Sequence, residues 1–155
     1  MNTVLNNVDR TVVLAVPECA LETVLRCVGQ GRFDEAIDQF NHHFTYNDNG
    51  IQLELSDKER LREFFKKTRE VYSDLVFETQ TIRHIGDDLI GEWTLRATVT
   101  EPFYGGLQRK VPILLRGASV VRLENGKITQ WSDYYDGLQS RRSAVAAFFT
   151  DWIEL

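Results

Sequence analysis

The sequence predicts an α+β fold in which a strongly curved antiparallel sheet wraps around about three helices and forms a cone. The first half of the chain has three segments with apolar residues at helical spacing, and the second half has four long segments typical of strands. The last strand follows Asn125-Gly126, the dipeptide that most strongly indicates a tight hairpin. Strands of this length must coil, so the sheet should enclose its helices and leave one open end.

The composition is that of a single globular domain without nucleic-acid or membrane partners. Of 155 residues, 43% are hydrophobic and 26% are charged, with a net charge of -5. Nucleic-acid binding needs a basic patch, and this chain has no strong cluster of Lys and Arg. No apolar run reaches the length of a membrane span, and no signal peptide is recognised. The two cysteines, Cys19 and Cys27, should lie about 12 Å apart on one helix, too far to bridge. We therefore expect buried thiols in the reducing cytoplasm.

The chain begins with a polar lead-in over residues 1–16, in which 11–16 could form a short strand. Pro17 suits the first turn of a helix. Apolar residues recur at helical spacing over 18–29, and again over 32–40. These two helices should form a hairpin at Gly29-Gln30-Gly31.

A short strand is predicted at residues 44–48, with Tyr46 and Asp48 on the same side. The turn cluster Asn47-Asp48-Asn49-Gly50 places Asp48 at the end of this strand, so Asp48 is either a turn residue or part of a pocket. The third helix should begin at Ser56, whose spacing from Glu59 fits a capping box.

The second half supplies the sheet on which this helix lies. Four strands are expected at residues 75–85, 89–101, 108–123 and 127–138. Residues 102–106 should end the second of these strands and connect it to the third. The apolar pattern of the final segment, 139–155, predicts a C-terminal helix. This helix should either close the mouth of the cone or pack on a second subunit.

The closing strand carries the most informative pattern. Alternation places Trp131, Asp133 and Tyr135 on one face, so that one carboxylate lies between two aromatic rings. If this face is the concave inside of the sheet, desolvation would disfavour the charge of Asp133. Asp133 could then act as an acid or base near neutral pH.

This order of elements, together with the ending Gly-Lys-Ile-Thr-Gln-Trp-Ser-Asp-Tyr-Tyr-Asp, resembles the SnoaL-like branch of the nuclear transport factor 2-like superfamily. The resemblance covers roughly residues 20–138, and the domain is taken as 17–138. Its other pieces are the segment 33–40, the strand ending at Asp48 and the helix start at 56–65. It implies a conical fold and a homodimer through the sheet face. Function does not follow from it, because this superfold hosts isomerases, hydrolases, cyclases and non-catalytic binders.

Ketosteroid isomerases of this superfamily have a general base that matches Asp48. Their oxyanion-hole tyrosine would fall on Val24, which has no donor, and their second donor would fall near Ala118. A base without its oxyanion hole lacks the largest electrostatic contribution, so that chemistry is not expected.

Limonene epoxide hydrolases end in a similar strand, and their catalytic Asp there matches Asp133. They also need an Arg-x-Asp pair, of which this chain has Arg96 but has Thr98 in place of the Asp. Polyketide cyclases of the SnoaL type need only a single acid–base Asp in a hydrophobic pocket, and Asp133 is the candidate for it.

We therefore expect Asp133 as the acid–base group and Asp48 as its assistant. The alternative for Asp133 is a structural, hydrogen-bonded carboxylate that anchors a neighbouring strand. The candidate pocket walls, each of which could instead be core or rim, are Tyr46, Trp93, Tyr104, Trp131 and Tyr135. No metal or cofactor is expected, since His42 and His43 should point to opposite faces of a strand.

Three functions remain open at this point. The first is a small cofactor-independent enzyme, of cyclase, isomerase or hydrolase type, that acts on a hydrophobic small molecule. The second is a non-catalytic ligand-binding or interaction module with the same pocket. The third is a structural dimer whose pocket is filled by side chains. A pocket of roughly several hundred Å³ that exposes Asp133 would favour the first two.

Overall fold

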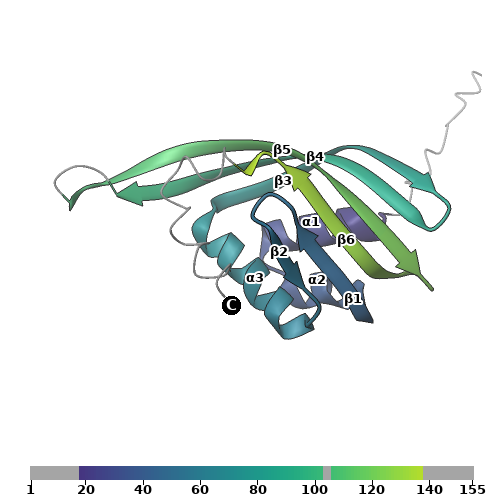
Figure 1. The fold of residues 1–155 in the computed structure, drawn as a ribbon. Helices are drawn as coiled ribbons and strands as arrows, with labels where there is room; N and C mark the ends of the chain where they lie inside the picture. Colours follow the sequence, from purple (N-terminus) through teal and green to yellow (C-terminus); the bar gives the residue numbers. More distant parts are fainter. Residues whose placement is uncertain (1–17, 103–105, 138–155) are drawn as a thin grey trace, which may run out of the picture.

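The structure of the protein, a computed structural model, describes residues 18–102 and 106–137. Its elements in chain order are α1 (Ala20–Gln30), α2 (Phe33–Asp38), β1 (Phe40–Asp48), β2 (Leu53–Leu55), α3 (Lys58–Val71), β3 (Ser73–Ile85), β4 (Asp88–Pro102), β5 (Gln108–Glu124) and β6 (Lys127–Tyr135). The long strands arch over the three helices, which lie together against one face of the sheet (Figure 1). The predicted α+β cone is confirmed. The strand expected at 11–16, the helix expected at 139–155 and Tyr104 lie outside the described residues.

The six strands form one sheet in the order β2-β1-β6-β5-β4-β3. The strands β3 to β6 make the expected antiparallel meander, with β4 and β5 paired over their whole length. The sheet as a whole is mixed, because β1 runs parallel to β6. The short strand β2, which the sequence did not indicate, pairs with the outer edge of β1.

The Asn-Gly hairpin forms as predicted between β5 and β6. Asn125 has φ 51° and Gly126 has φ 77°, and positive φ at both central residues is the geometry of a type I′ turn. Glu124 and Lys127 pair on either side of this turn. The turn sets the register of the first pairs, and the pairing then shifts by one residue between Arg122 and Leu123. The turn and this shift together determine which residues of β5 face those of β6.

Three local predictions need correction. The helix α2 ends at Asp38, and β1 begins at Phe40 instead of at residue 44. The helix α3 begins at Lys58, and its N-cap lies one residue later than expected, because Asp57 replaces Ser56 and accepts the backbone N–H of Arg60 at 2.9 Å. Asp is as good an N-cap as Ser, and its charge also interacts favourably with the positive end of the helix dipole.

The histidine pair of β1 also differs from expectation. The rings of His42 and His43 lie 4.8 Å apart, centroid to centroid, and both residues are exposed. The pairing of β1 with β6 shifts register between Phe40 and Thr45, so the strict alternation of a strand is interrupted there. Within the described residues, no group of three or more His, Cys, Asp or Glu side chains could hold a metal ion.

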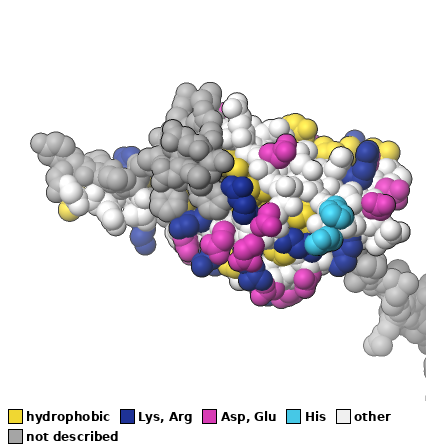
Figure 2. Space-filling model, turned by 60° about the horizontal axis from the view of Figure 1, so that its bottom comes forward, with side chains coloured by type: hydrophobic (Ala, Val, Ile, Leu, Met, Phe, Trp, Pro, Cys, Tyr) yellow, Lys and Arg dark blue, Asp and Glu magenta, His cyan; other side chains and the backbone are white. Residues whose placement is uncertain are grey.

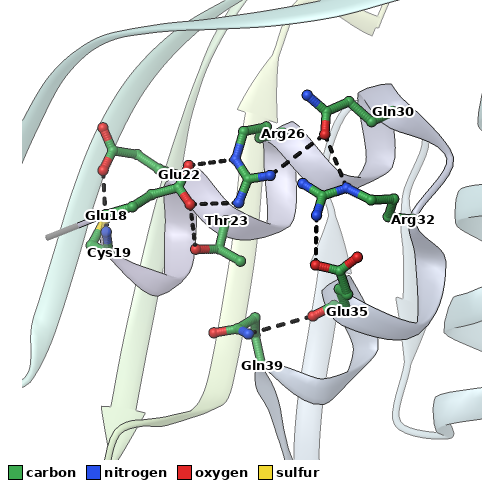
Figure 3. A network of polar contacts seen from close by, with 9 residues as sticks. All are labelled: Glu18, Cys19, Glu22, Thr23, Arg26, Gln30, Arg32, Glu35 and Gln39. Atoms are coloured by element: carbon green, nitrogen blue, oxygen red, sulfur yellow. Dashed lines mark hydrogen bonds and ion pairs between the residues drawn. The ribbon is translucent and has the colours of Figure 1, made fainter.

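The helical face of the molecule is polar and mixed in charge. Figure 2 shows Lys and Arg interspersed with Asp and Glu on this face, together with two neighbouring histidines. Figure 3 shows an exposed network along α1 and α2, in which Arg26 donates to Glu18 and Arg32 donates to Glu35. Exposed ion pairs of this kind contribute little to stability. None of the helices in the described part of the chain is long and apolar enough to span a membrane.

Candidate functional site

The parallel pairing of β1 with β6 brings Asp48 and Asp133 side by side. The two aspartates are register partners, and two residues earlier Tyr46 faces Trp131 in the same way. Register partners of neighbouring strands, which lie about 4.8 Å apart, project to the same face of the sheet. Asp48 is 6% exposed and Asp133 is 7% exposed. The site is therefore a pair of buried carboxylates among aromatic rings.

Asp133 is held by three hydrogen-bond donors. Its Oδ1 accepts from Ser119 Oγ at 2.5 Å and from Trp131 Nε1 at 2.7 Å, and its Oδ2 accepts from Tyr46 Oη at 2.8 Å. Trp93 Nε1 donates to Ser119 Oγ at 2.8 Å, so the hydroxyl proton of Ser119 is directed at Asp133. Burial raises the pKa of Asp133, and these hydrogen bonds oppose the rise because they favour the charged form.

Asp48 has a different set of donors. Its Oδ1 accepts the backbone N–H groups of Gly50 and Ile51, at 3.0 and 3.2 Å, and its Oδ2 accepts from Tyr135 Oη at 3.0 Å. Burial and the neighbouring charge of Asp133 raise the pKa of Asp48 to about 7. Two N–H groups occupy Oδ1, so a proton on Asp48 would reside on Oδ2, next to the hydroxyl of Tyr135.

The tyrosines around the pair remain neutral at physiological pH. Burial, followed by the charge of Asp133, raises the pKa of Tyr46 well above its ordinary value. Burial and the charge of Asp48 raise the pKa of Tyr135 far above its ordinary value and that of Tyr72 to about 12. Their hydroxyl groups can therefore donate hydrogen bonds but are not bases near neutral pH.

The loop after β1 fixes the site in place. The backbone N–H and the side-chain amide of Asn49 both donate to the carbonyl oxygen of Asp133, at 3.0 and 2.9 Å. The ring of Tyr135 lies directly over Gly50, where a Cβ atom would come within 2.2 Å of it. A Cβ atom at Gly117 would likewise come within 2.5 Å of the ring of Trp93. A side chain at either glycine would displace a ring of the site.

The carboxylates line a cavity of about 70 Å³. Eight of its lining residues are aromatic: Tyr46, Phe64, Phe65, Tyr72, Phe77, Trp93, Trp131 and Tyr135. The described lining residues include no Lys, Arg or His, so Asp48 and Asp133 are the groups that can carry charge there. Pockets that bind drug-sized ligands have volumes of roughly 300–1,000 Å³. The cavity is well below this range, so it admits a compact group but not a whole polycyclic molecule.

The structure brings most of the predicted site residues together. Asp48, Asp133 and four of the five predicted walls line the cavity: Tyr46, Trp93, Trp131 and Tyr135. Sequence reasoning missed Ser119, Asn49 and Tyr72. Only the register between β5 and β6 places Ser119 opposite Asp133, and no local pattern reveals that pairing. The turn cluster at residues 47–50 was the available signal for Asn49.

The positions that match catalytic residues of ketosteroid isomerases and limonene epoxide hydrolases do not supply those groups to this cavity. Val24 lines the cavity and carries no hydrogen-bonding group. Ala118 is the register partner of the exposed Tyr134, on the outer face of the sheet. Arg96 is also exposed, and it pairs with Glu78 instead of entering the cavity.

A family model for the SnoaL-like domain matches residues 21–131. The match includes Asp48 and ends two residues before Asp133. No curated protein matches the sequence.

Solved structures share the fold. A candidate SnoaL-like polyketide cyclase from Shewanella denitrificans has a TM-score of 0.68 at 9% identity, covering 82% of this chain and 95% of that chain. A candidate polyketide cyclase from Acidithiobacillus ferrooxidans has a TM-score of 0.63 at 24% identity, and the match covers 79% of this chain and 89% of that chain. A third similar structure is a hypothetical protein with a ketosteroid isomerase-like fold from Catenulispora acidiphila, in complex with trimethylamine. It has a TM-score of 0.65 at 18% identity, and the match covers 77% of this chain and 86% of that chain. Similarity at these identities shows the fold alone.

Asp48→Asn should change how stability depends on pH. The pKa of Asp48 is about 7 in the folded protein against 3.8 for an ordinary Asp, so the folded state binds more protons between these values. The free energy of unfolding should therefore fall as pH rises through this window, by up to about 4 kcal/mol. Urea unfolding near pH 5 and near pH 8 should show a smaller loss in the variant than in the wild type. The exposed-carboxylate control Asp87→Asn should behave like the wild type, and equal losses in wild type and Asp48→Asn would contradict the assignment.

Two donor variants should move the pKa of Asp48 in opposite directions. Ser119→Ala removes a donor that favours charge on Asp133, so Asp133 is protonated more readily and the pKa of Asp48 falls. Tyr135→Phe removes a donor to Asp48 itself, so its pKa rises. Titration of ¹³C-labelled carboxyl groups by NMR measures both shifts. Shifts of the same sign would show that the two carboxyl groups are not coupled in this way.

Proposed function

Because the chain belongs to the family of SnoaL-like domains, we propose that it is a cofactor-independent acid–base enzyme acting on a hydrophobic small molecule. Asp48 is the group that transfers the proton. The observation that carries the proposal is the buried pair of carboxylates at a cavity wall, where burial and the charge of Asp133 raise the pKa of Asp48 to about 7. A general acid–base group works best when its pKa lies near the working pH.

The two aspartates exchange the roles expected from the sequence. Asp133 has both oxygens engaged by three donors, and its charge helps to hold the pKa of Asp48 high. Asp133 is thus a positioning residue in this proposal. Asp48 carries its exchangeable proton at Oδ2, beside the hydroxyl of Tyr135.

The chemistry that suits these groups is proton transfer next to a carbonyl. The Asp48 carboxylate takes a proton from the carbon beside a carbonyl, and the electron pair moves onto the carbonyl oxygen. A hydroxyl of Tyr72 or Tyr135 donates to that oxygen, and Asp48 then returns the proton to carbon. In a cyclase the same carbanion would instead attack a second carbonyl of the substrate. The small cavity would hold the reacting end of the molecule.

A non-catalytic binding protein is the second candidate. Val24 offers no donor where ketosteroid isomerases have one, and Asp133 links β1, β5 and β6 as a structural carboxylate would. The structurally similar protein from Catenulispora acidiphila is a complex with trimethylamine, which is a compact molecule. A third possibility, a cavity filled by side chains, is disfavoured by the open volume beside Asp48.

Turnover of a substrate panel tests the enzyme proposal. With enones, epoxides and polyketide-like aldehydes, the wild type should convert at least one compound, and kcat/KM should rise with pH through about 7 if Asp48 is the base. Asp48→Asn should lower kcat/KM by about 10²-fold or more, Asp133→Asn should shift the pH profile, and Asp87→Asn should change neither. If the wild type converts nothing, or if Asp48→Asn is as active as the wild type, the enzyme proposal fails.

We also propose a homodimer through the outer face of the sheet. Four exposed apolar side chains lie on this face, on three strands: Val76, Leu114, Val120 and Tyr134. The exposed Arg96 of β4 lies between Val76 and Leu114, so the face combines apolar and charged groups. Exposed apolar side chains on a sheet face are candidates for burial in a protein interface.

The double variant Leu114→Glu with Val120→Glu should shift the protein from dimer to monomer in light scattering after gel filtration. Like charges on a self-complementary face would repel each other across the interface. Leu107→Glu, at an exposed leucine outside the strands, is the matched control and should stay dimeric. A wild type that is monomeric at every concentration would refute this assembly.

A further inference from the structure

We propose that the ligand of this cavity carries a compact organic ammonium group, which lies among the aromatic rings and against Asp48 and Asp133. The inference rests on the proposed function in that it takes the same cavity as the ligand site. It narrows a hydrophobic small molecule to one with a positively charged, alkyl-substituted nitrogen. Charge, acceptor geometry, wall chemistry and volume each support it.

The charge of the cavity is of one sign. The titratable groups that face Asp48 are Asp133 and Tyr135 on β6, Tyr46 on β1 and Tyr72 at the end of α3. The tyrosines stay neutral, so the carboxylates alone set the sign of the potential. The described residues that line the cavity include no cation to balance them. An uncompensated buried charge is costly, and a bound cation would remove that cost.

Each carboxylate has room for one more donor. A carboxylate offers about four acceptor positions. Asp133 accepts three hydrogen bonds from described residues, and so does Asp48. In both residues Oδ1 accepts two of these bonds and Oδ2 only one, from a tyrosine. The remaining position at each Oδ2 could meet the positive charge of an ammonium group, through an N–H or through a polarised N–CH₃ group.

The aromatic walls of the cavity suit the charge and the alkyl substituents of an ammonium group. Tyr46 and Trp131 stack with ring centroids 6.3 Å apart, and Trp93 and Tyr135 lie 6.0 Å apart. Aromatic faces attract cations through their quadrupole, and cages of this kind bind quaternary ammonium ligands. Alkyl groups on the nitrogen would meet the apolar part of the wall. A guanidinium or a bare ammonium would leave that part unused.

The volume limits the size of the group. At about 70 Å³ the cavity has about half the volume of the roughly 150 Å³ cavity that admits benzene. A head of a few heavy atoms fits, and any longer tail must extend outward. Phe77, Thr68 and Tyr135 are the half-buried lining residues, so a tail would leave the cavity on their side.

Calorimetry with choline and its neutral isostere 3,3-dimethylbutan-1-ol tests the charge requirement, and tetramethylammonium tests the head alone. Choline should bind at least about tenfold more tightly than the isostere. A cation favours ionised Asp48, so binding should release a proton, and affinity should rise about tenfold from pH 6 to pH 8. Titration in two buffers of different ionisation enthalpy measures the released proton in the wild type, without any variant.

Asp48→Asn keeps the acceptor for Gly50 and Ile51 but removes the charge, so it should lose most of the affinity and its pH dependence. Asp87→Asn should bind like the wild type. If the isostere binds as tightly as choline, the ammonium class is wrong but the cavity stays a ligand site. If neither binds while a neutral compound is turned over, the ammonium class is wrong and the enzyme proposal stands. If nothing binds and nothing is turned over, both fail.

Discussion

The burial of two carboxylates side by side is the constraint on which the rest of the site depends. Ionised groups are expensive to remove from water, and two of the same sign repel each other. The protein meets this with six hydrogen bonds, four from side chains and two from the backbone of the loop after β1. Burial and the charge of Asp133 still raise the pKa of Asp48 to about 7, so protonation of Asp48 relieves the remaining repulsion. Asp133 has three side-chain donors that favour its charge and Asp48 has one, so Asp133 keeps the anion more readily.

The fold delivers these donors from elements far apart in the sequence. The type I′ turn sets the first pairs of β5 and β6, and the register shift between Arg122 and Leu123 then places Ser119 opposite Asp133. The strand β4 contributes Trp93 behind Ser119. The parallel edge strand β1 adds Tyr46, and Asn49 then ties its end to β6. The helices cover this face of the sheet (Figure 1). Between them and the strands lies a small cavity whose lining includes eight aromatic residues. Because the four side-chain donors lie on strands, their geometry is held by the same backbone ladder that stabilises the sheet.

Local signals were sufficient for most of the fold. The long strands, the Asn-Gly turn and the shared face of Trp131, Asp133 and Tyr135 follow from alternation and turn chemistry. The parallel pairing of β1 with β6 does not, since register between distant segments leaves no local pattern. For the same reason Ser119 and the different surroundings of the two aspartates were out of reach. The N-cap of α3 is Asp57 and not Ser56. Asp and Ser are both strong N-caps, so the sequence alone could not distinguish the two positions.

The central claim is that Asp48 holds a proton below about pH 7 while the neighbouring Asp133 is ionised. Infrared spectroscopy with ¹³C-labelled aspartate measures it directly, because a protonated carboxyl group has a C=O band distinct from that of a carboxylate. The account predicts a buried carboxylic-acid band that disappears around pH 7, is missing in Asp48→Asn and disappears at lower pH in Asp133→Asn. A spectrum without this band near pH 6, or with the band unchanged in Asp48→Asn, would contradict it.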